Sequence, residues 1–300
     1  MTPTPPDPQR GTSDHRRQWR ECRYVYPVIA RRSKGLSIGV NLNPEKVCNF
    51  GCVYCQIDRR TPRDLSGVDI AVLRRELRYA LLEALSGNLW EEDRFADVPD
   101  ELRRVNDIAF SGDGEPTCLP NFDAAVRAAV SAKEEFGRED IKLVLITNAS
   151  RLDAPQVRRI LPQFDRHNGE IWAKLDAGTD EFFQRVNRPY PVITLRHVLE
   201  NIRGVARERP VVIQSMFFRL EGAEPPDSEI DAYTRHLREI VDSGGRIKLI
   251  QLYTIARPPA SATAAALPDD RLDALADRVR AALPDVPVEV YYGADVPPQR

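Results

Sequence analysis

Residues 36–55 of the chain read LSIGVNLNPEKVCNFGCVYC. The first seven residues, LSIGVNL (36–42), have the length and apolar character of a buried strand, and a loop with three closely spaced cysteines follows them. Such a short loop can bring three sulfur atoms together, and thiolates are soft ligands that suit iron–sulfur clusters or zinc. This stretch predicts a strand whose C-terminal end leads into a metal-binding loop.

Downstream of the cysteines, strand-like and helix-like segments alternate along the chain. The strand-like segments lie at 107–112, 141–148, 170–178, 210–218, 246–255 and 286–292. The helix-like segments lie at 68–86, 121–137, 154–161, 179–186, 193–207, 227–242 and 268–283. This alternation is typical of βα units on a parallel sheet, and the units are too few for an eightfold barrel. We therefore expect an α/β fold, a partial, TIM-like (β/α)6 barrel that forms one domain over residues 35–293.

The two ends of the chain differ in composition from this barrel segment. Residues 1–34 are rich first in proline and then in arginine, so we expect a partly disordered N-terminal segment, with a short tail at 294–300. Residues 16–34 interleave arginines with Trp19, Tyr24 and Tyr26. This pattern fits contact with an anionic partner, and it fits better a solvated lead-in segment with a few docking aromatics.

The overall composition is that of a soluble globular protein. Of 300 residues 42% are hydrophobic, and 43 Lys and Arg against 45 Asp and Glu give a net charge of −2. The chain therefore has no global basic field for non-specific nucleic-acid binding. Its apolar runs are far shorter than the ~20 residues of a membrane-spanning helix, so no membrane partner is expected. Five cysteines are too few for a disulfide scaffold, and a reducing cytoplasm is the expected location.

Cys48, Cys52 and Cys55 stand with three and then two residues between them. Three protein thiolates leave one metal position open, as a catalytic centre requires, whereas a closed structural site normally takes four ligands. Other interpretations stay open: a redox dithiol at Cys52 and Cys55, a zinc ion completed by a histidine or Cys118, a closed four-cysteine centre with Cys118 or Cys22, or unrelated core thiols.

The C-x3-C-x2-C spacing, with Tyr54 before the third cysteine and a strand before the loop, resembles the radical S-adenosylmethionine (SAM) superfamily. The resemblance implies that Cys48, Cys52 and Cys55 bind a [4Fe-4S] cluster and that Tyr54 approaches the adenine of SAM. The fourth iron would bind the amino and carboxylate groups of the methionine moiety. Electron transfer would cleave the sulfonium and yield a 5′-deoxyadenosyl radical, which abstracts a hydrogen atom from the substrate.

Residues 111–117, SGDGEPT, follow the next predicted strand and resemble the Gly-Gly-Glu-Pro motif of the same superfamily. Glycines permit close backbone approach, and the Glu115 carboxylate can accept charge-assisted hydrogen bonds from an ammonium group. The resemblance implies that the methionine end of SAM is bound by Gly112, Asp113, Gly114, Glu115 and Pro116. Taken alone, the segment also fits an ordinary strand-to-helix turn.

Further candidates lie near the ends of later predicted strands. Strand alternation places Trp172, Lys174 and Asp176 on one face, so Lys174 and Asp176 form either a core ion pair or a ligand contact. Arg188 precedes a proline in VNRPY and could clamp a carboxylate or a phosphate. We take Lys174, Asp176 and Arg188 as candidate catalytic residues. The candidate cofactor-binding residues at other strand ends are Asn148, Gln214 and Tyr253.

Within the superfamily, four segments resemble the wyosine-type Fe–S oxidoreductases related to tRNA 4-demethylwyosine synthase: NPEKVCNFGCVYCQIDR, SGDGEPT, ITNAS and AKLDAGTDEFFQRVNRP. That enzyme adds a two-carbon unit from pyruvate to N1-methylguanosine in tRNA, and it uses further N-terminal cysteines for a second cluster. Only Cys22 precedes Cys48 here, so we expect another radical reaction, on a small molecule or on tRNA. The resemblance also implies a reductase, a flavodoxin or a ferredoxin as electron donor.

Overall fold

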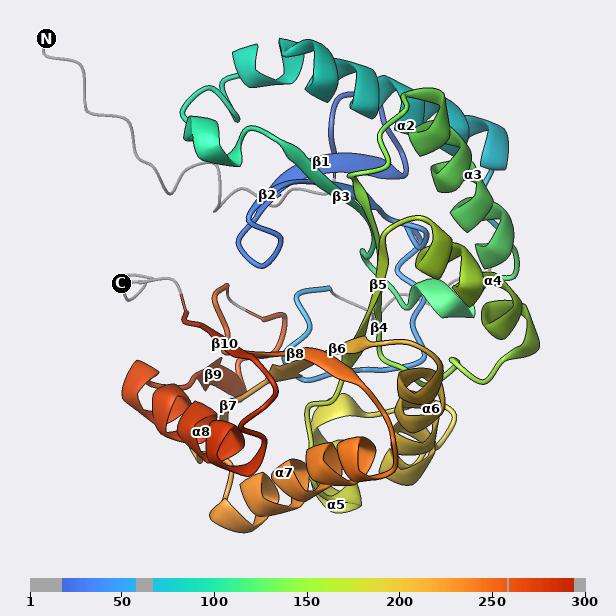
Figure 1. Ribbon diagram of the computed structural model, residues 1–300. Helices are drawn as coiled ribbons and strands as arrows, with labels where there is room; N and C mark the ends of the chain where they lie inside the picture. The colour runs from blue at the N-terminus through green and yellow to red at the C-terminus, as the bar shows by residue number, and fades with distance from the viewer. Residues whose placement is uncertain (1–17, 58–66, 258, 294–300) are drawn as a thin grey trace, which may run out of the picture. The chain divides into compact units, whose positions relative to one another are not determined.

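The computed structural model describes residues 18–57, 67–257 and 259–293 (Figure 1). Residues 1–17 of the predicted N-terminal segment and the predicted tail 294–300 lie outside the described residues. The chain divides into two compact units, each described here by itself. The first unit comprises Met1–Glu45, Leu65–Leu145 and Arg159–Glu170, and the second comprises Lys46–Asp64, Ile146–Arg158 and Ile171–Arg300.

The strands of the first unit are parallel except at one edge. β1 (Val25–Ala30) pairs antiparallel with β2 (Gly35–Val40). β2 then pairs in parallel with β3 (Val105–Phe110), and β3 pairs in parallel with β4 (Lys142–Thr147). β2 is buried along its whole length, as strands inside parallel sheets usually are. The C-terminal ends of β2 and β3 therefore lie at the same edge, which brings residues 41–43 next to residues 111–113.

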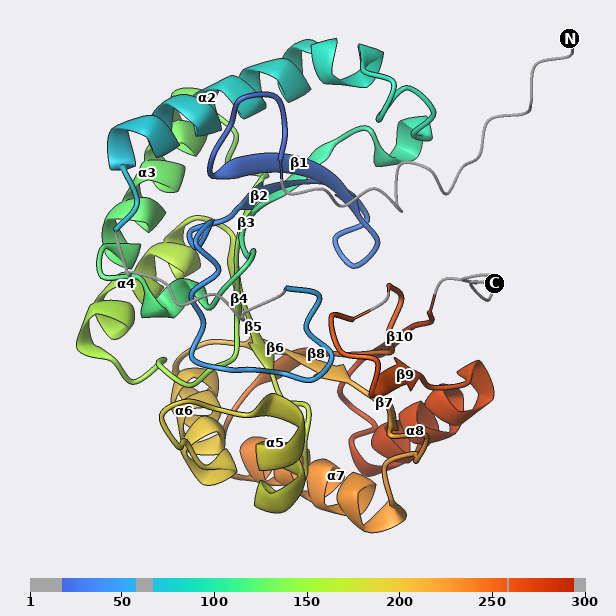
Figure 2. The same cartoon turned by 180° about the vertical axis from the view of Figure 1, so that it is seen from behind.

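Two long helices of the first unit, α2 (Ile70–Ser86) and α3 (Phe122–Glu135), lie side by side in both views (Figures 1 and 2). Asp69 caps α2 by accepting two main-chain N–H groups of its first turn, and Gly87 ends it with a φ of 94°. The apolar residues of α2 recur at intervals of three and four and are buried: Leu73, Leu77, Ala80, Leu81 and Ala84. Short 3-10 helices follow at η1 (Asn88–Glu91), η2 (Asp100–Leu102) and η3 (Pro116–Cys118).

One buried carboxylate docks the segment that leads into β1. Glu76 of α2 accepts the main-chain N–H groups of Arg23 (2.9 Å), Tyr24 (2.8 Å) and Val25 (3.2 Å). Because a buried N–H without a partner is costly, these three bonds determine where the strand begins. The sequence pattern predicts no strand here, since Pro27 interrupts the run. β1 is an edge strand, however, and a proline is tolerated there.

The second unit is built on four parallel strands, in the order β5 (Gly169–Lys174), β6 (Val211–Met216), β8 (Ile247–Tyr253) and β10 (Val288–Tyr291). A separate, small antiparallel sheet pairs β7 (Phe218–Leu220), which follows β6 in the sequence, with β9 (Ala264–Ala266), which follows β8. The helices of this unit are α5 (Asp180–Asn187), α6 (Leu195–Glu208), α7 (Asp227–Asp242) and α8 (Asp269–Ala282). The division between the units passes through β4, α4 (Pro155–Arg166) and β5.

Each strand and helix predicted from residue 36 onward has a counterpart among the described residues, and α7 has the predicted bounds. Six of the seven strands predicted from residue 36 onward are one to three residues longer than the observed ones. The strand predicted at 170–178 ends at Lys174, and the one predicted at 210–218 is broken at Phe217, because β7 leaves the parallel sheet to pair with β9. The sequence pattern does not predict the short strands β7 and β9. None of the described helices is long and apolar enough to cross a membrane.

Candidate active site

The cysteine loop, residues 48–55, is fixed in the second unit by the residues that end α5. The Gly51 N–H donates to the Asn187 carbonyl (3.1 Å), and the Val53 N–H donates to the Val186 carbonyl (2.9 Å). These are main-chain bonds of the kind that join neighbouring strands. The position of the loop therefore depends on where α5 ends.

A ring of side chains fixes Asn49, next to the first cysteine. Asn49 Nδ2 donates to Ser150 Oγ (2.8 Å), and Asn49 Oδ1 accepts from Asn148 Nδ2 (2.8 Å). The Ser150 N–H donates to Asn148 Oδ1 (3.0 Å), which closes the ring. On its other side, the Asn49 carbonyl accepts the N–H of Tyr190 (2.7 Å). Asn148, a candidate cofactor-binding residue, thus lies against the cysteine loop and positions it.

Each of the three sulfur atoms of the loop accepts a hydrogen bond from an N–H group. Cys48 Sγ and Cys55 Sγ each accept the main-chain N–H two residues downstream (3.4 and 3.5 Å), and Cys52 Sγ accepts from Asn187 Nδ2 (3.5 Å). None of the three cysteines forms a disulfide. An N–H donor at each sulfur stabilises the thiolate, which is the form that binds metal.

This donor set fits an iron–sulfur cluster better than a single metal ion. Among the described residues, no three His, Cys, Asp or Glu side chains are arranged to hold one ion, as zinc would require. In a cluster each thiolate binds a different iron, so its sulfur ligands lie farther apart than those of one ion. Burial, together with the nearby Cys48 and Asp176, raises the pKa of the Cys52 thiol to about 12. A metal bound by the Cys52 thiolate would have to displace this proton.

Asp176, just beyond β5, is a buried carboxylate with three donors. Asp176 Oδ1 accepts the Met216 N–H (2.9 Å), and Asp176 Oδ2 accepts from Asn187 Nδ2 (3.1 Å) and from the Tyr54 hydroxyl. Burial and this carboxylate raise the pKa of Tyr54, which keeps its hydroxyl protonated. Lys174 Nζ lies 5.9 Å from the centre of the Tyr54 ring, within cation–π range. The structure thus brings together three residues predicted from the sequence: Asp176 contacts the Tyr54 hydroxyl, and Lys174 lies over the Tyr54 ring.

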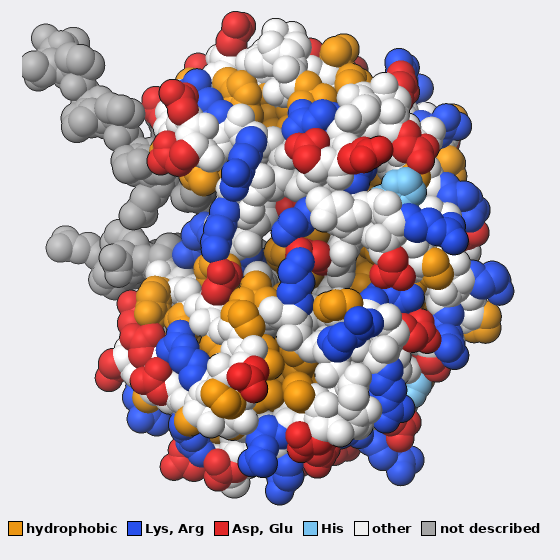
Figure 3. Space-filling view, viewed as in Figure 1, with side chains coloured by type: hydrophobic (Ala, Val, Ile, Leu, Met, Phe, Trp, Pro, Cys, Tyr) orange, Lys and Arg blue, Asp and Glu red, His pale blue; other side chains and the backbone are white. Residues whose placement is uncertain are grey.

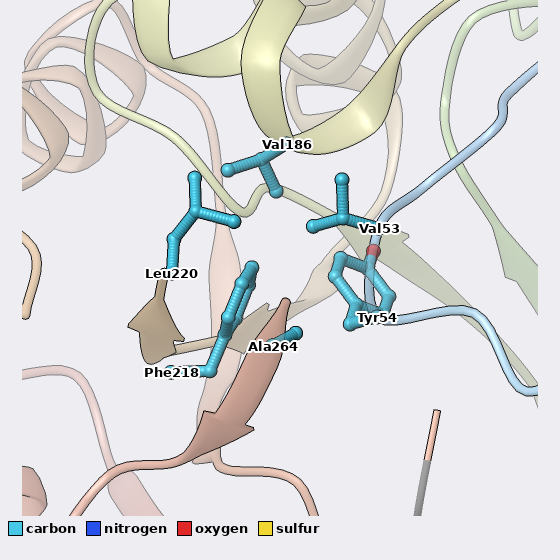
Figure 4. Close-up of a cluster of buried hydrophobic side chains, with 6 residues drawn as sticks. All are labelled: Val53, Tyr54, Val186, Phe218, Leu220 and Ala264. Atoms are coloured by element: carbon cyan, nitrogen blue, oxygen red, sulfur yellow. The ribbon is translucent and has the colours of Figure 1, made fainter. Parts of the chain in front are cut away.

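The Tyr54 ring is held by apolar packing as well as by its hydroxyl (Figure 4). Its edge-on contact with Phe218 of β7 has a centroid distance of 5.5 Å. The apolar cluster around the ring consists of Val53, Tyr54, Val186, Phe218, Leu220 and Ala264 (Figure 4). β7 and β9, which the sequence pattern does not predict, supply half of this cluster. Tyr54 is therefore fixed at both ends, as a residue that orients a ligand must be.

Gln214 lies on β6 and is fully buried. Gln214 Nε2 donates to Gln251 Oε1 (2.7 Å), which lies opposite it on the neighbouring strand β8. Gln214 Oε1 has no hydrogen-bond partner among the described residues. Tyr253 ends β8, is also buried, and its carbonyl accepts the N–H of Phe217 (2.9 Å). Tyr253 therefore lies at the C-terminal end of a parallel strand, where ligand sites form in such sheets, and Gln214 lies two residues before the end of β6.

Arg188 is placed differently from the other candidate catalytic residues. It follows α5 in the left-handed region with a φ of 44°, and its side chain is exposed. Its carbonyl accepts the Gly51 N–H (3.0 Å). The structure thus joins the main chain of Arg188 to the cysteine loop and leaves its side chain outside the buried group around Asp176.

In the first unit, residues 111–117 are shaped by Asn41, which directly follows β2. Asn41 Nδ2 donates to Asp113 Oδ2 (2.8 Å), and Asn41 Oδ1 accepts the Asp113 N–H (3.1 Å). Gly112 between them has a φ of 156°, and a Cβ there would lie 2.4 Å from Asn41 Oδ1. Asn41 is not among the site residues predicted from the sequence, although a polar residue at the end of a buried strand is a signal for such a role.

Glu115 is buried and caps η3. Its Oε1 accepts the Thr117 N–H (3.2 Å) and the Thr117 hydroxyl (2.6 Å), and Pro116 begins the short helix. Gly114 precedes this cap and is partly exposed.

The two remaining cysteines differ in exposure. Cys118 ends η3 and is partly exposed, whereas Cys22 is buried. Burial and the nearby Glu76 raise the pKa of the Cys22 thiol to about 11. Cys22 is therefore a protonated thiol at neutral pH.

The family model of the Radical SAM superfamily matches residues 42–227, which include the cysteine loop and residues 111–117. The chain therefore belongs to the radical SAM superfamily, and it is an enzyme of the class that uses a [4Fe-4S] cluster and SAM. Enzymes of this class also need a reductant that supplies an electron. The match confirms the resemblance inferred from the spacing of the cysteines.

Several curated proteins are similar in sequence. A UPF0026 protein of Methanocaldococcus jannaschii is 29% identical over 181 residues, which are 59% of this chain and 47% of that protein. A UPF0026 protein of Helicobacter pylori is 26% identical over 247 residues, 82% of this chain and 70% of that protein. The dual-specificity RNA methyltransferase RlmN of Methylobacterium sp. is 28% identical over 244 residues, 78% of this chain and 51% of that protein. The chain thus spans about half the length of two of these relatives.

Solved structures share the fold. A radical SAM methyltransferase from Sphaerobacter thermophilus aligns with a TM-score of 0.59 at 16% identity, over 89% of this chain and 69% of that chain. TYW1 with a lysine–pyruvate adduct bound aligns with a TM-score of 0.51 at 14% identity, over 83% of this chain and 74% of that chain. These likenesses confirm the predicted fold class, an α/β partial barrel with mostly parallel strands.

Proposed function

We propose that Cys48, Cys52 and Cys55 bind the [4Fe-4S] cluster and that the chain cleaves SAM reductively. The observation that carries the proposal is the N–H donor at each of the three sulfurs, on one loop fixed by main-chain bonds. When bound, the cluster supplies the electron that cleaves SAM to methionine and a 5′-deoxyadenosyl radical. Tyr54 orients the adenine from its fixed position, and residues 112–116 bind the methionine end.

Anaerobic reconstitution with iron and sulfide tests this proposal. The wild-type protein is expected to take up about four irons per chain. With dithionite it should convert SAM to 5′-deoxyadenosine. The triple variant Cys48→Ala, Cys52→Ala, Cys55→Ala should lose both properties. Cys22→Ala and Cys118→Ala serve as matched controls and should keep both, because three ligands suffice for a SAM-binding cluster. Loss of iron from Cys118→Ala, with a spectrum that SAM leaves unchanged, would instead identify a closed four-cysteine centre.

For the substrate, we propose RNA as the first class to test. The similarity to an RNA methyltransferase over 78% of this chain supports it. The described part of the arginine-rich lead-in is largely engaged within the protein: Arg20 pairs with Glu83 (2.8 Å) and Glu92 (2.7 Å), and Arg23 pairs with Glu45 (3.2 Å). Acidic and basic side chains are interspersed over the face seen in Figure 3. We therefore expect the protein to contact few RNA phosphates, and to bind RNA that is not its substrate only weakly.

Salt dependence distinguishes RNA binding from a small-molecule substrate. The affinity for total tRNA, measured by fluorescence anisotropy, should fall with salt at a log–log slope of about −0.7 to −0.9 per phosphate contacted. Arg31→Ala with Arg32→Ala should reduce the slope, whereas Arg280→Ala on α8 should leave it unchanged. A flat salt dependence would exclude RNA and favour a small molecule.

A flavodoxin or ferredoxin is the proposed electron donor. We propose a reducing cytoplasm as the location, and the finding that none of the five cysteines forms a disulfide fits it.

A further inference from the structure

Asn187, the last residue of α5, lies between the cysteine loop and the buried carboxylate. It is 3% exposed. Its Nδ2 lies 3.1 Å from Asp176 Oδ2, 3.5 Å from Cys52 Sγ and 3.5 Å from Tyr54 Oη. A primary amide has two N–H groups. The shortest contact assigns one of them to Asp176. The other N–H lies at equal distance from two acceptors, Cys52 Sγ and Tyr54 Oη, and so serves the Cys52 sulfur together with the Tyr54 hydroxyl oxygen.

The surroundings of Asn187 determine which way its amide points. If its nitrogen and oxygen exchanged places, the carbonyl oxygen would face both a carboxylate and a sulfur, and all three atoms are acceptors. The Asp176 carboxylate therefore fixes the amide with its N–H groups toward the cysteine. Asp176 is itself held by the Met216 N–H (2.9 Å), so the arrangement is anchored to β6.

This orientation has a cost on the opposite side of the amide. Asn187 Oδ1 is buried and has no hydrogen-bond donor among the described residues. An unsatisfied buried acceptor is destabilising. Two contacts that only an N–H donor can provide stand against this cost: the bond to Asp176 Oδ2 and the N–H directed at the Cys52 sulfur.

We propose that Asn187 is a positioning residue that sets the reduction potential of the cluster through its N–H···S bond to Cys52. The inference rests on the proposed function, since it requires the cluster at these cysteines. Reduction adds negative charge, part of which lies on the ligand sulfurs. An N–H dipole directed at sulfur therefore stabilises the reduced form more than the oxidised form. Removing the donor makes the potential more negative.

The test is a potentiometric titration of reconstituted protein, followed by the EPR signal of the reduced cluster. In Asn187→Leu, reduction is expected to be about tenfold less favourable, which is about 59 mV for a one-electron couple. Asn187→Asp keeps the shape of the side chain and removes both N–H groups. The single O–H of a protonated carboxyl would be taken by the Asp176 carboxylate, which leaves no donor for the sulfur. This variant should therefore shift the potential in the same direction.

Asn201→Leu is the matched control. Asn201 is a buried asparagine of α6 in the same unit, and its Nδ2 donates to the Ala149 carbonyl (2.9 Å). Its loss should lower the melting temperature and leave the potential unchanged. Wild-type potentials in both Asn187 variants, with four irons bound, would overturn the inference and leave the proposed function standing. A wild-type protein that takes up no cluster at these cysteines would overturn both.

Discussion

Replacing Gly112 by alanine is expected to lower the rate of 5′-deoxyadenosine formation by about 100-fold, or about 2.7 kcal/mol, while the iron content stays unchanged. The Cβ of alanine would lie 2.4 Å from Asn41 Oδ1 and 2.9 Å from Asn41 Cα, and the φ of 156° is one that alanine rarely adopts. Residues 111–113 must then move away from Asn41, which breaks the two bonds between Asn41 and Asp113. The cysteines lie in the other unit, so cluster binding is retained.

The matched control for Gly112→Ala is Gly137→Ala. Gly137 also has a positive φ, 61°, but a Cβ there would meet no atom within 4 Å. This control should cost about 1 kcal/mol of stability and should leave SAM cleavage unchanged. The affinity for SAM is measured by calorimetry alongside the rate. Wild-type affinity in Gly112→Ala would show that residues 111–117 do not bind the methionine end.

Replacing Gly178 by alanine is expected to destabilise the second unit by about 3 kcal/mol. A Cβ at Gly178 would lie 2.3 Å from the Glu229 carbonyl oxygen and 2.3 Å from the Tyr233 nitrogen, both in the main chain of α7. Main-chain atoms of a helix cannot move aside singly, so α7 would shift as a body. The shift would also strain the bond from the Thr179 hydroxyl to Glu229 Oε2 (2.7 Å). Urea unfolding followed by circular dichroism measures the loss.

Gly204→Ala is the control for this prediction, and its expected effect on stability has the opposite sign. Gly204 lies on an exposed position inside α6, and a Cβ there would meet no atom within 4 Å. Alanine at this position should raise the stability by about 0.5–1 kcal/mol, because alanine has the higher helix propensity. Equal stabilities of the Gly178→Ala variant and the wild-type protein would mean that α7 does not pack against Gly178 as described.

The sequence was most informative where chemistry depends on short local spacing. Cys48, Cys52 and Cys55 need only their own loop to converge, so their spacing was sufficient to predict a cluster site. The pairing of Gln214 with Gln251 through a hydrogen bond of 2.7 Å, by contrast, depends on which strands are neighbours in the sheet. Period and spacing are properties of neighbouring residues, and a single sequence records them directly.

What the sequence could not show are contacts made across long separations and contacts made by the main chain. Asn187 meets Cys52 across 135 positions, and Asn41 meets Asp113 across 72. An asparagine also has common structural roles at turns and caps, so Asn187 carries no signal of its own and Asn41 only its place at the end of a buried strand. Arg188 suggested a cationic clamp, but the atom that contacts the cysteine loop is its carbonyl oxygen, which every residue possesses.

The attachment of the cysteine loop to the residues that end α5 has a consequence for evolution. It uses main-chain N–H and carbonyl groups, which are the same whichever side chains are present. Tyr190 and Val192, in the same segment, are each 83% exposed. Mutations at such outward-facing positions can change what the surface recognises without displacing the cysteines. A lineage of these proteins can therefore acquire new partners on this side of the molecule while its electron-transfer chemistry is inherited unchanged.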